Sequence, residues 1–208
     1  MEVSFHNVAK RYRYEWIFRD IDFTFQNGKK YAILGPNGSG KSTLLKVLSG
    51  HLTPSKGKVN FSAGEKKIDI DEVYLHTSYA APYIELIEEF TLLEALNFHK
   101  KFKPFLNQLE ISHLVDILGF QKSKNKLIRY FSSGMKQRLK LVLAICSDSP
   151  ILLLDEPTTN LDTQGMNWYR DLIQTYGQNR LVVIASNIEA DYDFCDTTLN
   201  ILDYKKKA

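Results

Sequence analysis

The 208-residue sequence has few of the features that mark secreted proteins, membrane-spanning proteins or proteins stabilised by a structural metal site. Its only cysteines, Cys146 and Cys195, are far apart and lack metal-ligand spacing, so we expect two packed thiols in a reducing compartment. No apolar run approaches the roughly 20 residues that cross a bilayer, and the N-terminus lacks the charged start and apolar block of a secretion signal. We therefore expect a cytoplasmic chain that does not itself span a membrane.

The sequence also has no large excess of positive or negative charge. The formal net charge is only +3, and the lysines are scattered along the chain, whereas nucleic-acid-binding domains concentrate basic residues on one face. We therefore expect no nucleic-acid partner, and we expect the lysines at 205–207 to be a solvated tail without a role. With 44% hydrophobic and 25% charged residues, the chain has enough apolar material for one folded domain with a core.

Four apolar patterns predict strands. The first 12 residues alternate as a strand does, and the alternation over 21–34 on either side of Asn27-Gly28 predicts two paired strands joined by a tight turn. Residues 151–154 and 181–185 are uniformly apolar, which is typical of strands buried on both faces of a parallel sheet. The sequence therefore predicts an α/β fold with a mostly parallel central sheet.

Other segments predict helices and turns. Apolar residues follow helical spacing from Ser42 to Gly50 and from Ser133 to Cys146. Residues 51–80 are expected to form short strands with turns at Pro54, Gly57 and Gly64. The stretch 86–130 is rich in helix formers without alternation, and it is the candidate for a helical subdomain.

The strongest motif is GPNGSGKST at residues 35–43, which matches the phosphate loop GxxxxGK[ST] and lies between a predicted strand and a predicted helix. Its glycines allow backbone amides to point at a phosphate, Lys41 places a cation on the outer phosphates, and the Ser42 hydroxyl can ligate Mg²⁺. The candidate nucleotide-binding residues here are Gly35, Pro36, Asn37, Gly38, Ser39, Gly40, Lys41, Ser42 and Thr43.

A second motif, ILLLDEP at 151–157, delivers two carboxylates to the carboxyl end of a buried strand, where open α/β sheets bind ligands. We expect Asp155 to hold Mg²⁺, directly or through water, and Glu156 to orient and polarise the attacking water. The two motifs together predict hydrolysis of a nucleoside triphosphate with Mg²⁺.

The base is predicted by elimination. A guanine site would need an NKxD motif, but Asn125-Lys126 is followed by Leu127-Ile128, so adenine is favoured. Tyr12 is the candidate for stacking on the adenine ring, with Tyr14 and Trp16 as alternatives for that role.

The order of these motifs resembles the nucleotide-binding subunits of the ATP-binding-cassette (ABC) family over essentially the whole chain. GPNGSGKST resembles the family's Walker A loop, ILLLDEP its Walker B strand, TTNLD at 158–162 its D-loop, and FSSGMKQR at 131–138 its signature LSGGQ. The resemblance implies one ATP-binding domain over residues 1–208, with the helical subdomain at about 86–135. It adds Asp162 of the D-loop to the expected nucleotide contacts.

In this family the signature of one subunit closes over the nucleotide held by the phosphate loop of a second subunit. The resemblance therefore implies a dimer, homo- or heteromeric, in which the Ser132 hydroxyl and the Ser133 and Gly134 amides bind the γ-phosphate. ADP lacks that phosphate, so hydrolysis is expected to loosen the pair.

Three departures from the family pattern bear on activity. The signature has Phe131, Ser133 and Met135 in place of Leu, Gly and Gln. No glutamine occurs between Gln26 and Gln108, so the family's Q-loop glutamine, which ligates Mg²⁺ and links the nucleotide to the membrane partner, is absent; Ala81 or Pro82 aligns there.

The third departure concerns the catalytic histidine that the family carries after a late strand. No histidine follows His113, and Asn187 takes this place, where its amide can bond a phosphate oxygen but cannot exchange a proton. We expect hydrolysis that is retained but slow.

The sequence thus predicts the ATPase subunit of an ABC transporter, peripheral on the cytoplasmic face of the cell membrane and working with a polytopic membrane subunit. The compact length resembles haem-exporter ATPases, and FSSGMKQR is similar to exporter-type signatures, which favours export. Two alternatives stay open: a low-turnover regulatory subunit of a heterodimer, and a soluble ABC protein without a transport role.

Overall fold

A computed structural model describes residues 1–205, so Lys206 and Lys207 of the expected tail lie outside the described part. The chain forms two compact units, each built from more than one stretch of sequence. The first unit contains residues 1–79, 150–156 and the chain from Asn179 onward, and the second contains residues 80–149 and 157–178.

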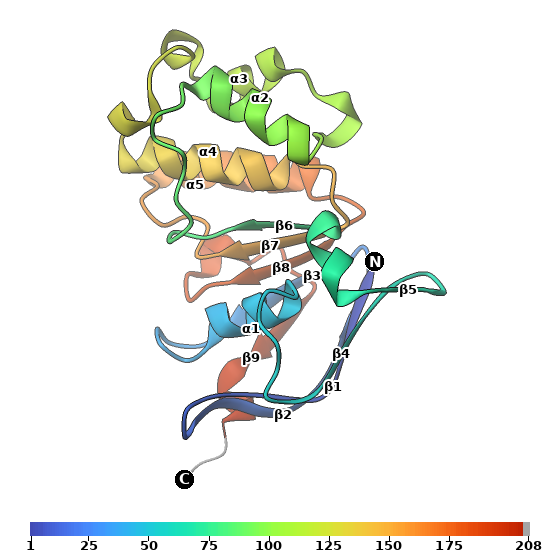
Figure 1. Ribbon diagram of the computed structural model, residues 1–208. Coiled ribbons are helices and arrows are strands. Elements are labelled where there is room, and N and C mark those ends of the chain that lie inside the picture. The colour runs from blue at the N-terminus through green and yellow to red at the C-terminus, as the bar shows by residue number, and fades with distance from the viewer. Residues whose placement is uncertain (206–208) are drawn as a thin grey trace. The chain divides into compact units, whose positions relative to one another are not determined.

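The first unit has a four-stranded antiparallel sheet with the strand order β2-β1-β4-β5 (Figure 1). Its strands are β1 (Glu2–Tyr12), β2 (Glu15–Phe25), β4 (Lys56–Ala63) and β5 (Lys66–Ile68). Burial roughly alternates along β2, because one face of this sheet packs on the core and the other faces solvent.

A second sheet has the order β6-β7-β8-β3-β9. Its strands are β3 (Lys30–Leu34), β6 (Thr77–Ala80), β7 (Ile151–Asp155), β8 (Leu181–Ala185) and β9 (Thr197–Asn200). The pairs β7–β8, β8–β3 and β3–β9 are parallel, and every residue of β7 and β8 is buried. The predicted α/β class and the two central buried strands are confirmed.

The predicted pairing within residues 21–34 is wrong. The chain does turn at Asn27-Gly28, but β2 belongs to the antiparallel sheet and β3 to the parallel one. Strand β3 has parallel partners on both of its hydrogen-bonding edges, β8 and β9, so neither edge is left to pair with β2. The Tyr31 ring then packs edge-on to Phe25, with centroids 5.1 Å apart, so aromatic contacts join the two sheets at this turn.

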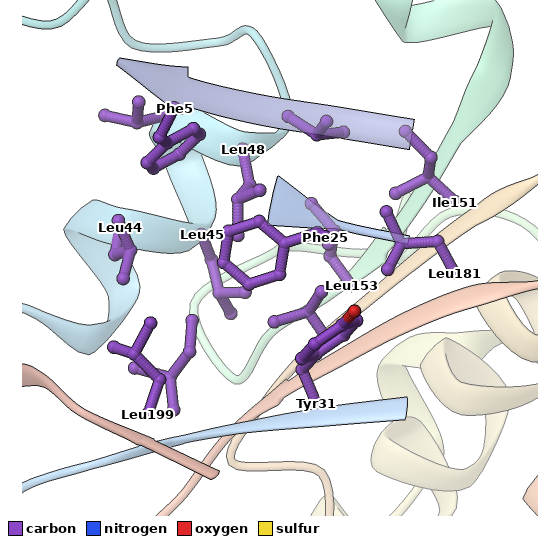
Figure 2. Close-up of a cluster of buried hydrophobic side chains, with 14 of the residues drawn as sticks. Phe5, Phe25, Tyr31, Leu44, Leu45, Leu48, Ile151, Leu153, Leu181 and Leu199 are labelled. Atoms are coloured by element: carbon purple, nitrogen blue, oxygen red, sulfur yellow. The ribbon is translucent and has the colours of Figure 1, made fainter. Parts of the chain in front are cut away.

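Helix α1 (Lys41–Leu48) lies between the two sheets (Figure 1). Figure 2 shows Leu44, Leu45 and Leu48 of this helix among Phe5 and Phe25 of the antiparallel sheet and Leu153 of the parallel sheet. All of these side chains are fully buried or nearly so. Because burying such side chains is the main favourable term in folding, the packing of α1 fixes the loop that precedes it.

The second unit is helical. It contains α2 (Leu92–Phe102), α3 (Ile111–Leu118), α4 (Ser133–Ile145) and α5 (Thr163–Tyr176), and α4 packs against α3 and α5. Thr91 begins α2 with a capping box, in which the Glu94 amide donates to Thr91 Oγ1 and the Thr91 amide donates to the Glu94 carboxylate. The predicted helix from Ser133 is confirmed.

Short 3₁₀ segments join these elements. They are η1 (Ile70–His76), η2 (Leu106–Gln108), η3 (Gln121–Ser123), η4 (Ile128–Tyr130), η5 (Glu189–Asp191) and η6 (Ile201–Tyr204). Among residues 1–205, no helix is both long enough and apolar enough to cross a bilayer.

The expected turn at Gly57 is also wrong, because this residue lies inside β4. Its φ is +81°, and a Cβ there would stand 2.2 Å from the Asn7 carbonyl oxygen. The pairing of β1 with β4 shifts register between His6 and Ala9, so glycine is needed here for close approach of two backbones.

Both cysteines are free thiols, as expected. Cys146 is buried, and burial raises the pKa of Cys195 to about 12, with the neighbouring Asp196 acting in the same direction. The Cys195 thiol therefore stays protonated and unreactive at neutral pH.

His99 in α2 generates a prediction on stability. Its Nε2 lies 2.8 Å from the Ser147 hydroxyl, and burial, with a smaller effect of Lys103, lowers its pKa from 6.5 to about 4. Between these two values the unfolded chain binds the proton more readily than the folded one, so stability falls as pH decreases through this window. We expect a His99 contribution of about 3 kcal/mol to be lost between pH 7 and pH 4.

Urea unfolding at several pH values measures this effect. His99→Gln should flatten the pH dependence of the unfolding free energy in this window, whereas His51→Gln on the exposed surface should leave it steep. Equal pH dependence in the two variants would contradict the assignment.

Candidate functional site

Three neighbouring strands of the parallel sheet bring the predicted residues of the first unit to one edge. Ile33 and Asp155 both pair with Ala185, so β3, β7 and β8 end side by side. The phosphate loop follows β3, Glu156 follows β7, and Asn187 follows β8 after one residue. The edge of an open α/β sheet is where such folds bind ligands.

The phosphate loop has a backbone that only glycine tolerates at two positions. Gly35 and Gly40 have φ of +148° and +111°, in the region that L side chains rarely adopt. A Cβ on Gly35 would stand 2.7 Å from Ser39 Oγ, and one on Gly40 would stand 2.3 Å from Ile17 Cγ2. The loop is therefore held in one shape by backbone conformation and by its neighbours together.

The loop surrounds a buried cation. Lys41 is only 4% exposed, and its Nζ donates to the Gly35 carbonyl at 2.8 Å and to the Pro36 carbonyl at 3.4 Å. Within the described residues this ammonium has no carboxylate partner, and the buried Ser39 hydroxyl has no hydrogen-bond partner. A bound anion would pair with the buried ammonium and accept a hydrogen bond from the buried hydroxyl. The N-terminus of α1 adds a favourable electrostatic potential for an anion at the same place.

Glu156 opens onto the same pocket as the phosphate loop. The pocket is lined by Ile17, by residues 37–43 and by Glu156. Glu156 has a φ of +44°, unusual for a residue other than glycine, and its amide donates to the Ala185 carbonyl at 2.8 Å. The unusual backbone conformation ends β7 just before Glu156, whose carboxylate is the candidate base for a water beside the phosphates.

The expected magnesium ligands are a buried aspartate and a pocket hydroxyl. Asp155 is 2% exposed, and the Tyr79 hydroxyl lies 3.5 Å from its Oδ2; Ser42 lines the pocket. Among the residues that the structure describes, no cluster of three or more His, Cys, Asp or Glu side chains could hold a metal. Two protein ligands fit Mg²⁺, which usually keeps several waters and binds substrate phosphates, better than they fit a metal held by protein alone.

Asn187 is exposed on a loop that its neighbours fix. The buried Ser186 hydroxyl donates to Asp191 Oδ2 at 2.5 Å and accepts from the Ile188 amide at 3.0 Å. These bonds on either side hold the backbone of Asn187, so its amide can face a ligand at the sheet edge without ordering a flexible loop first.

The three aromatic candidates for the adenine ring differ in their surroundings. Tyr12 ends β1, is 49% exposed and lies outside the residues that line the phosphate pocket. Tyr14, in the hairpin turn, is 96% exposed. Arg11, Arg19 and Lys56 lie 4.9 to 5.4 Å from the centre of the Trp16 ring, so cations already contact that ring.

Ile17 is a pocket residue that the sequence motifs do not identify. Lys10 pairs with Phe18 and Arg11 with Trp16, so Ile17 is the extra residue of a β-bulge in β2. Bulges redirect side chains, and this one brings Ile17 against Gly40. Strand alternation alone could not have predicted a bulge, so no signal in the sequence marks this contact.

The signature residues lie in the second unit, at the start of α4. Ser132 caps the helix, because its Oγ accepts from the Met135 amide at 3.2 Å, and the hydroxyl proton stays available for a further acceptor. Ser132 and Ser133 are exposed. A Cβ on Gly134 would stand 3.1 Å from the Asn160 carbonyl oxygen, so glycine allows the D-loop to pass close to the signature.

Asp162 has a structural role at the end of the D-loop. Its Oδ1 accepts from the Gly165 amide at 2.7 Å and so caps α5. The sequence identified this residue through the family motif, whereas the structure shows its carboxylate bonded within its own helix.

Comparison with known proteins decides the family. The family model described as ABC transporter matches residues 18–159, which is more than half of the chain. The chain belongs to the ABC transporter family. Two motifs on each unit, the phosphate loop with ILLLDEP and the signature with the D-loop, are thus those of an ABC ATPase.

Individual ABC proteins resemble the chain along most of its length. The lantibiotic transport ATP-binding protein SrtF of Streptococcus pyogenes is 28% identical over 92% of this chain and 82% of its own. The ABC transporter ATP-binding protein YybJ of Bacillus subtilis is 29% identical over 94% and 90%. The bacterial cassette MJ0796, solved as a dimer, has the same fold, with a TM-score of 0.79 at 22% identity over 96% of this chain and 94% of that one.

The chain is therefore the ATP-binding, ATP-hydrolysing subunit of an ABC transporter. Its departure at the Q-loop has a defined structure. Of the two residues expected to align with the family's glutamine, Ala81 is fully buried, and the Pro82 carbonyl accepts from Lys140 Nζ at 2.7 Å.

The packing at Gly40 generates a prediction on nucleotide binding. Gly40→Ala should weaken Mg-ATP binding at least about tenfold, because the added methyl would overlap Ile17 and the backbone would have to leave its present shape. Titration with a fluorescent ATP analogue measures the dissociation constant.

Gly28→Ala is the matched control. Gly28 also has a positive φ, +74°, but a Cβ there meets nothing within 4 Å, and the residue is outside the pocket. Equal dissociation constants for the two variants would show that the Gly40 contact does not shape the site.

Proposed function

We propose that two copies of this subunit bind ATP between them, and that hydrolysis releases the pair and drives a membrane subunit. The observation that supports this best is the buried Lys41, which has no carboxylate partner among the described residues and lies in a glycine loop beside Glu156. Ser132 and Ser133 remain exposed, as residues that bind a second molecule's nucleotide must be.

Each residue has a distinct task in this proposal. The phosphate loop amides and Lys41 bind the phosphates, Ser42 and Asp155 hold Mg²⁺, and Tyr12 packs on the adenine ring. Bound Mg²⁺ neutralises charge on the phosphate oxygens. Glu156 accepts a proton from the attacking water, and Asn187 donates an amide hydrogen bond to the γ-phosphate.

The partner copy completes the site in the proposal. The Ser132 hydroxyl proton is not used by the helix cap, and the Ser133 and Gly134 amides are at the start of α4, where an anion is stabilised. Affinity between the copies then depends on the γ-phosphate, because ADP cannot reach these groups. The dimeric state of MJ0796 is consistent with such an assembly.

We also propose a docking place for the polytopic membrane subunit, which would hold the protein on the cytoplasmic face of the membrane. A groove in the second unit has one wall formed by residues 82–86, 88 and 89, and the other by Lys136 and Lys140 of α4. Glu88 pairs with Lys136 and Glu89 with Arg129, whereas Glu85 forms no ion pair within the described residues and can attract a basic residue of a docked cytoplasmic segment. In this proposal residues 1–208 form one ATP-binding domain, and the groove belongs to its helical subdomain at about 86–135.

Glu156→Gln tests the proposed mechanism. The amide cannot accept the proton, so we expect turnover to fall by about 10² to 10⁴, while ATP binding persists. The trapped nucleotide should then hold two copies together, and analytical ultracentrifugation with Mg-ATP should report a dimer.

Lys41→Ala in the same background is the control and should stay monomeric, because it cannot hold the outer phosphates. A Glu156→Gln protein that stays monomeric at saturating Mg-ATP, or that hydrolyses ATP at the parent rate, would contradict the proposal.

A further inference from the structure

The missing Q-loop glutamine raises the question of how a docked partner could influence the nucleotide site. The groove's wall segment, defined as residues 82–90, is joined to the signature helix α4 by side chains of that helix. Lys140 Nζ donates to the Pro82 carbonyl at 2.7 Å, and Lys136 Nζ forms an ion pair with Glu88. The two lysines are four residues apart and so share one face of α4.

The same wall segment is also joined to the residues that precede the signature. The Arg129 amide donates to the Glu88 carbonyl at 3.1 Å, and the Ile128 amide donates to the Phe90 carbonyl at 2.9 Å. The Arg129 side chain adds an ion pair with Glu89 at 3.7 Å. Glu88 is therefore bonded through its backbone to one side of the signature and through its carboxylate to the other.

The first five residues of the signature, FSSGM at 131–135, thus lie between two sets of bonds to one segment. Lys136 is directly joined to the cap, because its amide donates to the Ser132 carbonyl at 2.9 Å. A displacement of the wall segment would therefore be felt at both ends of the residues that bind the γ-phosphate. Networks of hydrogen bonds and ion pairs can carry coupling between two sites, and all of these bonds lie within one compact unit.

The hydrogen bond of Lys140 connects helix α4 to the backbone at the start of the wall segment. Lys140 is partly buried, and burial, followed by repulsion from Lys136, lowers its pKa, while Glu85 on the wall segment acts in the opposite direction. Among the described residues, the Lys140 ammonium has one hydrogen bond, to the carbonyl of Pro82, one of the two residues expected to align with the family's metal-binding glutamine. The bond reaches the Q-loop backbone without any glutamine.

We propose that the wall segment transmits docking of the membrane subunit to the signature through Lys136, Lys140 and the backbone bonds of Glu88 and Phe90. This route acts on the signature helix and replaces the route through the absent glutamine. The inference rests on the proposed function, since it assumes a partner in the groove and a nucleotide at the signature.

Linkage makes the inference testable without the membrane subunit. If docking at the groove affects the signature, then engagement of the signature must affect the groove by the same free energy. The Glu156→Gln protein with Mg-ATP supplies that engagement. Hydrogen exchange of the wall-segment amides, measured by mass spectrometry with and without Mg-ATP, reports the response in the groove.

We expect Mg-ATP to slow exchange in residues 83–90 at least about threefold in the Glu156→Gln dimer. Lys136→Met with Lys140→Met should abolish this slowing while the dimer still forms. The double variant Lys136→Met with Lys140→Arg has a side chain that can again donate to the Pro82 carbonyl, so it should recover part of the slowing. Lys100→Met, on the exposed surface of α2 and without a side-chain hydrogen bond or ion pair among the described residues, should behave like the parent.

Each other outcome is decisive. If the dimer forms and exchange in the wall segment does not change, the coupling is absent. If the slowing persists in the double methionine variant, the lysines do not carry it. If ultracentrifugation shows no dimer in the parent, the proposed function fails first and the inference with it. Thermal unfolding of each variant shows whether the substitutions reduce the stability of the whole protein. If the double methionine variant is as stable as the Glu156→Gln protein and Mg-ATP still slows exchange in its wall segment, the proposal is wrong.

Discussion

The site depends on the close contact between the phosphate loop and the bulge of β2. Gly40 has a backbone conformation that side chains avoid, and the space that a Cβ would fill is taken by Ile17. On its other side the loop leads into α1, which is locked between two sheets by buried leucines. The loop is thus fixed before any ligand arrives, so binding ATP need not include the cost of ordering it.

The same rigidity explains why a charge can stay buried. Lys41 would be costly in an apolar interior, but the loop supplies two carbonyl oxygens to its ammonium group. These oxygens do not neutralise it, and a phosphate does. The cation, the free Ser39 hydroxyl and the start of α1 therefore favour the same ligand, and Glu156 opens onto that pocket from the next strand but one.

The sequence predicted the parts of the site that depend on local order. The phosphate loop, the DE pair and the signature are contiguous, and their chemistry follows from residue type and spacing. The strands at 151–154 and 181–185 were predictable because parallel strands buried on both faces are uniformly apolar. The pairing of residues 21–34 was not, because an Asn-Gly turn fixes a reversal of the chain but not the sheet that each strand joins.

Other features depend on contacts between distant residues, which no local pattern reveals. Gly57 looked like a turn residue, but its role is the approach to Asn7 on another strand. Ile17 enters the pocket only through a register shift between β1 and β2. The links from Glu88 to Arg129 and Lys136 likewise join residues about 40 and 48 positions apart, so the sequence reveals the absence of the Q-loop glutamine but not the bonds that we propose take over its task.

The claim that each nucleotide is shared by two copies is tested most directly by mixing two inactive variants. Lys41→Ala removes the phosphate cation, and Ser133→Asp places a carboxylate against the γ-phosphate at a helix start that tolerates it. Each variant alone should be inactive. An equal mixture forms dimers with one intact composite site, and we expect it to regain about a quarter of the parent ATPase activity. A mixture no more active than its separate components would contradict the account.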